Sequence, residues 1–250
     1  MPIDYLVAWL MIFLRGLGII LQLPVLVGHP IPIPVRMGLG VCLATLLAGV
    51  VPAAPVAFAL WPIVAAVAGE VWLGLAMGFV IRLVFAAVEM AGRVISSEIG
   101  LSVLPGIGAP EPANEPLAAL LSSFAVVMFF LLGGQYGVLA AFARSFRHAA
   151  AGHAAFDPGG GTSLIQGTAH VLELGLRIAA PFIAMNFLVT LAFAVLARAV
   201  PKTNVFILSL SARGLVGLGL LGAGGSLVAR YLATEFGELP LRMLHLLPVR

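Results

Sequence analysis

The chain has 250 residues, of which 62% are hydrophobic and only 9% charged, and its mean hydropathy is +1.15. Soluble domains carry about 25% charged residues, so this composition excludes a water-soluble fold and indicates an integral membrane protein. The formal net charge of +3 comes without any run of Lys and Arg, which excludes an evident nucleic-acid-binding surface. Cys42 is the only cysteine, so neither an internal disulfide nor a cysteine-based metal site can form.

Six apolar segments follow one another along the chain, rich in Leu, Val, Ala and Gly and without the alternation of a barrel strand. Inside a bilayer only helices and closed barrels satisfy every backbone group, so long continuous apolar runs predict helices. We expect an all-α, polytopic membrane protein built of helical hairpins, with residues 1–250 forming a single membrane domain. The helices are expected near residues 5–27, 37–51, 56–88, 117–143, 171–199 and 205–232.

Proline and glycine separate these segments. Each proline removes a backbone donor and disfavours helix in the residue before it. The longest such stretch, Leu104 to Pro116, holds four prolines and two glycines, and a flexible Gly-rich loop precedes a helix start at Thr162 or Ser163. The remaining breaks are expected at residues 28–34, 52–55 and 201–204.

Small residues within the segments predict surfaces where helices approach one another closely. Gly74 and Gly78 form a small-xxx-small pair, and the last segment contains six glycines, among them Gly214 and Gly217. Without a side chain at such positions, two helix backbones can come into contact inside a membrane. We therefore interpret these four glycines as helix-packing residues.

Ionised side chains within or beside the apolar segments indicate polar contacts away from lipid. Arg15 and Glu70 each have apolar sequence on both sides, and a charge in such a position is costly unless it faces protein or a water-filled cavity. We expect these charges to form buried polar contacts that hold neighbouring helices together. The residues expected to do so are Arg15, Glu70, Arg82, Glu89, Arg93 and Glu98.

The loop charges do not follow the rule that places Lys and Arg on the cytoplasmic side. With six alternating spans, the loop expected from Glu89 to Glu115 is acidic, yet it falls on the same side as Arg36 and Lys202, while Arg144 and Arg147 fall opposite. One hypothesis accounts for this: some apolar helices are covered by other subunits of a large assembly instead of crossing lipid as ordinary spans.

No arrangement of residues indicates an enzyme, a cofactor or a metal site. His148 and His153 are five residues apart, which does not place two ligands on one helix face, and the glycines at 159–161 lack the Gly-Lys-Ser/Thr ending of a phosphate loop. An intramembrane enzyme would need clustered His, Asp or Ser. A small-solute secondary transporter remains an alternative, because it would also use intramembrane charges and broken helices.

Several short motifs, in order along most of the chain, resemble the FliR family of flagellar biosynthetic proteins and its type III secretion (SctT-like) counterpart. The longest is the stretch Arg198 to Phe206. The others are Leu14-Arg15 with Pro24 and Ile33 to Leu39, Gly69-Glu70 with Gly74 and Gly78-Phe79, Ala91-Gly92 with Gly100-Leu101-Ser102, and Arg177 to Pro181.

The resemblance implies a non-enzymatic core subunit of a protein-export gate in the bacterial inner membrane, at a flagellar basal body or injectisome base. It implies FliP-like and FliQ-like partner subunits and a large FlhB-like gate protein. Unfolded protein substrates would pass through the centre of this helical assembly. Part of the assembly would be raised out of the bilayer, and the rest would contact membrane lipid. It also implies that the loop beginning at Leu101 forms part of a plug that closes the pore. The residues assigned to that plug are Leu101, Ser102, Val103, Leu104, Pro105, Gly106, Ile107 and Gly108.

Overall fold

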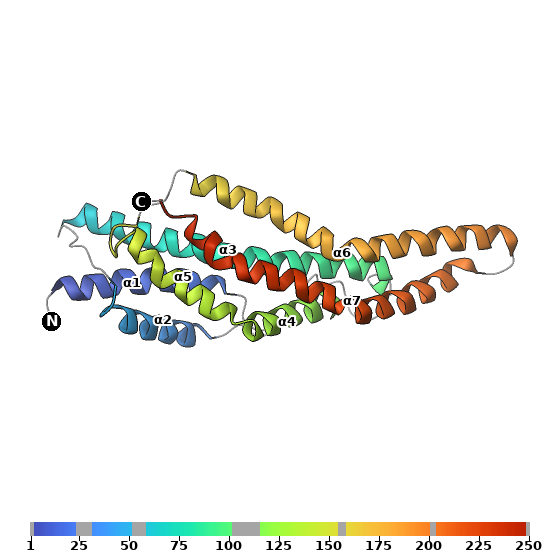
Figure 1. The fold of residues 1–250 in the computed structure, drawn as a ribbon, viewed down its shortest axis with the longest axis horizontal. Helices are drawn as coiled ribbons and strands as arrows, with labels where there is room; N and C mark the ends of the chain where they lie inside the picture. The colour runs from blue at the N-terminus through green and yellow to red at the C-terminus, as the bar shows by residue number, and fades with distance from the viewer. Residues whose placement is uncertain are drawn as a thin grey trace. The chain divides into compact units, whose positions relative to one another are not determined.

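The computed structural model describes residues 3–23, 32–51, 59–101, 116–154, 159–200 and 204–248, and these form seven helices without a strand among them. The expected all-α, polytopic fold class is therefore confirmed. The helices, drawn in Figure 1, are α1 (Ile3–Gln22), α2 (Ile33–Leu47), α3 (Leu60–Ile99), α4 (Pro116–Leu131), α5 (Gly134–His148), α6 (Gly160–Ala199) and α7 (Val205–Leu244).

The chain divides into two compact units, and the long helices contribute to both. Unit 1 contains residues 1–84, 129–170 and 234–250, and unit 2 contains residues 85–128 and 171–233. The expectation that residues 1–250 form a single membrane domain stays a prediction.

In unit 1, α2 packs beside α1 through two small residues (Figure 1). Gly40 and Ala44 are the buried positions of α2. A Cβ atom placed on Gly40 would lie 3.0 Å from the Phe13 ring, so only glycine fits there without movement. Trp9 adds a hydrogen bond from Nε1 to Thr45 Oγ1 at 3.2 Å, which joins the two helices at one more point.

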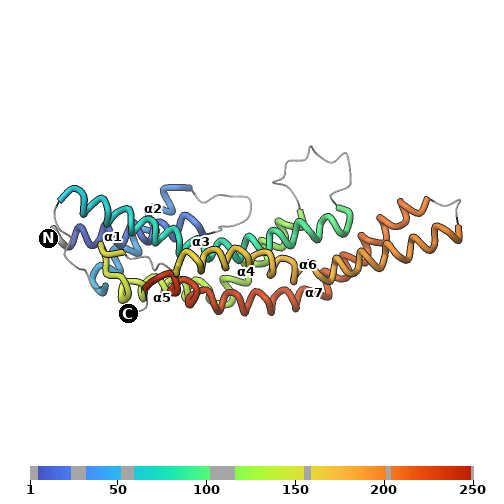
Figure 2. The backbone as a smooth tube through the Cα atoms, turned by 90° about the horizontal axis from the view of Figure 1, so that it is seen from above, coloured from blue at the N-terminus to red at the C-terminus, as the bar shows by residue number. Residues whose placement is uncertain are grey.

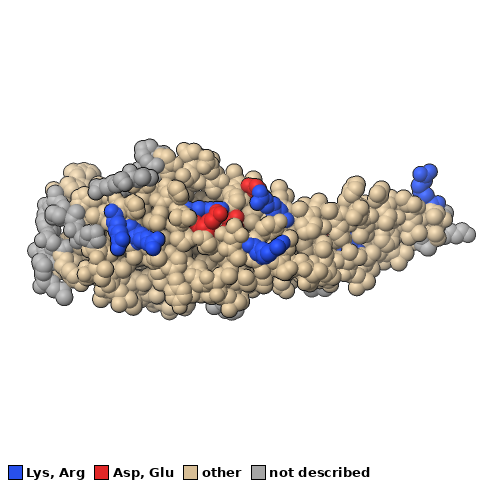
Figure 3. Space-filling model, in the orientation of Figure 1, with Lys and Arg blue, Asp and Glu red and all other residues tan. Residues whose placement is uncertain are grey.

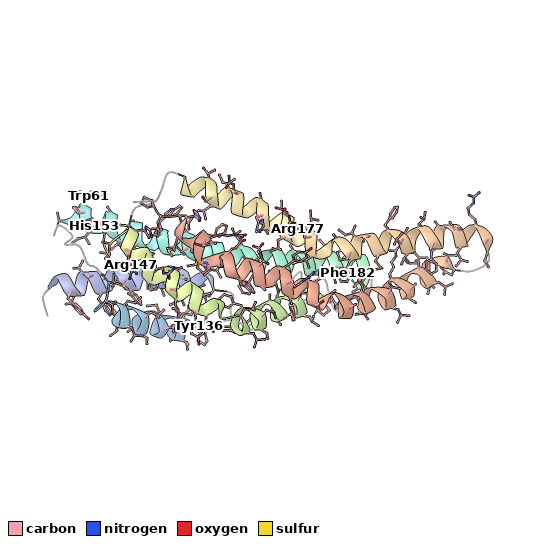
Figure 4. The ribbon with its side chains drawn as sticks, in the orientation of Figure 1. Trp61, Tyr136, Arg147, His153, Arg177 and Phe182 are labelled. Atoms are coloured by element: carbon pink, nitrogen blue, oxygen red, sulfur yellow. The ribbon has the colours of Figure 1, made fainter. Side chains whose placement is uncertain are left out.

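In unit 2, the end of α3 contacts α4 and the hairpin formed by the second half of α6 and the first half of α7. The two arms of that hairpin lie side by side in both views (Figures 1 and 2). Phe182 of α6 is buried inside the unit (Figure 4). A Cβ atom on Gly92 would lie 2.5 Å from Ala118 Cα, so α3 and α4 touch at backbone distance.

Several helices extend beyond their expected bounds. Helix α6 begins at Gly160 instead of near residue 171, and α7 ends at Leu244 instead of near residue 232. Helix α2 begins at Ile33 instead of near residue 37, because Pro34 occupies the first turn, where its missing N–H costs nothing. Helix α3 continues to Ile99, so the expectation that residues from Glu89 onward form a loop was wrong. Within this stretch Glu89 and Arg93 are four residues apart and pair with each other, a spacing that is typical of a helix.

One expected helix is two. Residues 117–143 were expected to be continuous, but α4 ends at Leu131 and α5 begins at Gly134. Gly133 has φ 72°, a left-handed conformation that glycine adopts without strain and that ends a helix. Proline does not break the helices in the same way: Pro181 and Pro240 lie inside α6 and α7.

Four of the helices, α1, α3, α6 and α7, are long and apolar enough to cross a membrane, and the broken pair α4 and α5 is a fifth candidate. Helix α2 has 15 residues and is shorter than the roughly 20 needed. Figure 3 shows the few charged side chains of the visible face standing in an otherwise uncharged surface. The chain is therefore a membrane protein, as the composition indicates.

Candidate functional site

The most constrained region of unit 1 is the line along which α1 and α3 touch, and glycine makes that contact possible. A Cβ atom on Gly18 would lie 2.7 Å from the carbonyl carbon of Gly74, and one on Gly78 would lie 2.7 Å from Gln22 Cβ. The contacts advance together along both helices, so α1 and α3 run parallel. Gly74 also faces the backbone of Arg15, which places that arginine directly against α3.

Arg15 and Glu70 form a two-point ion pair across this contact. The guanidinium Nε donates to Glu70 Oε2 at 2.6 Å and Nη2 donates to Oε1 at 2.9 Å. Both side chains are 0% exposed. Removing two charges from water costs free energy, and a buried ion pair offsets this cost only with well-directed hydrogen bonds. The two parallel hydrogen bonds between Arg15 and Glu70 are of this kind.

Helix α5 and the turn after it complete what we call the Arg15 cluster: Arg15, Glu70, Ser145, Ala149 and Gly152. Arg15 Nη1 donates to Ser145 Oγ at 2.9 Å and Nη2 donates to the Ala149 carbonyl at 3.1 Å. The Gly152 backbone N–H donates to Glu70 Oε1 at 2.9 Å.

The ring of Phe146 lies 4.0 Å from the guanidinium carbon of Arg15 and covers one face of the cation. The cluster thereby joins α1, α3 and α5 at one point. Its groups satisfy one another, and the Ser145 hydroxyl, which accepts from Arg15, itself donates to the Phe142 carbonyl at 2.7 Å. Its chemistry is suited to holding three helices in register, not to catalysis.

A second polar cluster in unit 1, the Glu235 cluster, joins α6 to the end of α7. It consists of His170, Glu235, Glu238 and Arg242. Glu235 lies 2.8 Å from His170 Nε2 and 2.8 Å from Arg242 Nη1, and Arg242 Nη2 lies 2.6 Å from Glu238. The mostly buried Glu235 carboxylate therefore contacts two side chains on different helices, His170 on α6 and Arg242 on α7.

The other charges expected to be buried contacts have different surroundings. Arg82 is exposed and donates from Nη1 to Gln22 Oε1 at 3.3 Å. Glu89 and Arg93 pair with each other along α3 and are each about half exposed. Glu98 accepts a hydrogen bond from Asn186 of α6 in unit 2. Arg82, Glu89 and Arg93 are exposed within the single chain. Their burial therefore stays a prediction, and it concerns the assembled state.

The two glycines singled out in the last segment also differ. A Cβ atom on Gly217 would lie 2.5 Å from Ile99 Cγ1, so α7 packs closely on the end of α3. Gly214 meets no atom within 4 Å in the part of the chain that the structure describes. Of the expected plug residues, Leu101 is described and partly exposed, whereas residues 102–108 lie outside the described residues.

Sequence reasoning missed the neutral partners of these charges. Ser145, Asn186 and Gly152 are single polar or small residues within the chain, and nothing in their spacing links them to a charge far away in sequence. His170 gives no such signal either, because its partner Glu235 lies 65 residues farther along the chain. Among the described residues, no group of three or more His, Cys, Asp or Glu side chains is placed to hold a metal ion.

The sequence matches a known family model, that of the bacterial export proteins, family 1, over residues 6–239. The chain belongs to this family. It is 27% identical over 241 residues to the flagellar biosynthetic protein FliR of Escherichia coli, covering 93% of this chain and 91% of that protein. FliR of Caulobacter vibrioides is 25% identical over 232 residues and covers 92% of each chain. The Yop proteins translocation protein T of Yersinia pestis is 27% identical over 149 residues, 56% of this chain and 55% of that protein.

As a member of the family, the chain is a component of a flagellar or type III secretion export apparatus and not an enzyme. It works with other proteins of that apparatus and resides in a membrane. None of the relatives described above is a small-solute transporter, so that alternative has no support. The Arg15 cluster is accordingly a structural site of a bacterial export protein.

Proposed function

We propose that the chain is a core subunit of the flagellar protein-export gate in the bacterial inner membrane, where it forms part of the channel for unfolded substrates together with FliP-like, FliQ-like and FlhB-like proteins. The flagellar biosynthetic protein FliR of Escherichia coli is matched over 91% of its length, whereas the Yop proteins translocation protein T of Yersinia pestis is matched over 55% of its length. This difference supports a flagellar rather than an injectisome gate.

The observation that carries the proposal is the exposed apolar surface on the second half of α6, in unit 2. Exposed apolar side chains run along this part of the helix from Ile183 to Leu196, beyond the half-exposed ion pair of Glu173 and Arg177. Charged side chains on a helix that crosses lipid are costly unless they face protein or water, so this ion pair and the apolar surface after it suit a helix that other subunits cover.

The hairpin of α6 and α7 in unit 2 supports the same conclusion. Only 22% of the most apolar stretch of α6 and 11% of that of α7 are buried within the chain. Apolar surfaces of this size on a soluble or membrane protein mark places where another protein or lipid docks. Sibling subunits of an export gate would cover the part of the hairpin that extends beyond the bilayer.

Co-purification in mild detergent tests the proposal. The chain is expressed together with the products of the neighbouring export-gate genes, with a tag on this chain only. Recovery of a stable complex that contains FliP-like and FliQ-like subunits is the expected result. A stable monomer or dimer that leaves those subunits behind, or that binds a small solute, would overturn the proposal.

A further inference from the structure

We propose that unit 1 binds one anionic phospholipid, with an acyl chain in a groove between α1, α3 and α6 and the phosphate at Arg82. The groove has a volume of about 240 Å³ and is lined by Gln22, Trp72, Leu75, Ala76, Phe79 and Leu164. Gln22 is the one amide among otherwise apolar side chains. The lining suits a hydrocarbon chain with a polar group at one end.

Arg82 does not line the groove itself but lies beside Gln22, the polar residue of the lining. It follows Phe79 by three residues on α3, so the two side chains are neighbours on the helix surface. Its Nη1 reaches Gln22 Oε1, an atom of a groove-lining residue, at 3.3 Å. That amide is neutral, so the contact leaves the positive charge of the exposed guanidinium available to an anion. A phosphate with an attached acyl chain complements both the charge and the apolar lining.

The depth of the groove fits one leaflet of a bilayer. Helix α1 has 20 residues, about 30 Å, and ends at Gln22, so Gln22 and Arg82 lie where the hydrocarbon thickness ends. Trp72 lies ten residues before Arg82 on the parallel helix α3, a rise of about 15 Å, which is half that thickness. A lipid held at Arg82 would therefore extend its chain past Phe79 to Trp72 at the middle of the bilayer.

Trp72 is 63% exposed and offers a direct reporter of the occupant. The chain has three tryptophans, so the full-length double variant Trp9→Phe, Trp61→Phe retains Trp72 alone. This protein is reconstituted into phosphatidylcholine nanodiscs that contain a small, equal fraction of brominated phosphatidylglycerol or brominated phosphatidylcholine. Bromine quenches tryptophan fluorescence only at close range, so the quenching measures which lipid occupies the groove.

We expect phosphatidylglycerol to be preferred about fivefold, because one Arg near a membrane surface contributes about 1 kcal/mol toward an anionic lipid. Arg82→Gln should reduce the preference to about one. Arg93→Gln, which removes an exposed arginine already paired with Glu89 farther along α3, should leave the preference unchanged. Circular dichroism of each variant verifies that the helices remain folded.

Native mass spectrometry of the detergent-purified wild-type chain provides a second measurement that needs no tryptophan substitution. A retained phosphatidylglycerol that is lost in Arg82→Gln and kept in Arg93→Gln supports the proposal. Equal quenching by the two lipids, or a preference that survives in Arg82→Gln, would overturn it. Weak quenching by both lipids would also overturn it, since another protein would then occupy the groove.

Discussion

Arg15 of α1 and Glu70 of α3 face each other across the glycine-lined contact of their helices, joined by two hydrogen bonds of 2.6 and 2.9 Å with neither side chain exposed. Glycines allow the backbones to approach, and the approach brings the two charges within bonding distance. Ser145 and the turn after α5 then attach to the same pair. The fold of unit 1 therefore depends on a polar contact within an apolar bundle.

Removing one member of this pair should cost more than removing both. Arg15→Leu or Glu70→Leu alone leaves an uncompensated buried charge, and each should lower the stability by about 3–5 kcal/mol. The double variant removes both charges and should be less destabilised than the sum of the single variants. Unfolding of the detergent-purified protein in mixed micelles, followed by circular dichroism, measures these differences. Strictly additive losses would show that the two side chains are not coupled.

Gly74→Leu should weaken the contact between α1 and α3. Any side chain at position 74 would collide with the backbone of Arg15, and overpacking of this kind costs about 1–3 kcal/mol. Gly214→Leu is the matched control, because position 214 meets no described atom within 4 Å. Thermal unfolding of the isolated chain should show a loss for the first variant only. Equal losses for the two variants would contradict the contact.

The sequence predicted the kind of fold and the charges that matter, but it could not pair them. Arg15 and Glu70 stood out because each interrupts an apolar run, a local property. Their partner Ser145 is 130 residues from Arg15, and only the folded backbone brings it there. The break at Gly133 was missed for a related reason. Glycine is common in membrane helices, and its left-handed φ of 72° belongs to the fold and not to the composition.

Glu235→Gln should destabilise unit 1 more than Glu173→Gln destabilises unit 2. The mostly buried Glu235 carboxylate pairs with both His170 and Arg242, and losing hydrogen bonds to charged groups costs about 1.5–3 kcal/mol. Glu173 pairs with Arg177 on one exposed helix face, where such a pair contributes about 0.3–0.5 kcal/mol.

Amide hydrogen exchange of the full chain measures both changes locally. Faster exchange near residues 166–172 and 234–242 is expected in Glu235→Gln, and wild-type exchange is expected around Arg177 in Glu173→Gln. Unchanged protection in the Glu235 variant would mean that the cluster does not hold α6 to α7.

Replacing residues 104–108 by a Gly-Ser sequence of equal length should make the assembled gate leak ions if this loop closes the pore. The Pro- and Gly-rich stretch resists helix formation, and non-helical backbone within a membrane is tolerated where it lines a cavity. A fluorescent reporter of membrane potential in cells that express the complete gate measures the leak. The same replacement at residues 155–158 is the control. A tight membrane with the first replacement and a normal gate would show that residues 104–108 are an ordinary connector.

Site-specific photo-crosslinking tests most directly whether sibling subunits cover the exposed apolar faces of α6 and α7. A photoreactive amino acid is placed at Phe187 or Leu215, which are 67% and 76% exposed in the single chain, in cells that express the neighbouring export-gate genes. Crosslinks to FliP-like or FliQ-like subunits from at least one of these positions are predicted. Crosslinks to lipid alone from both positions, in an assembly that still exports protein, would contradict the account.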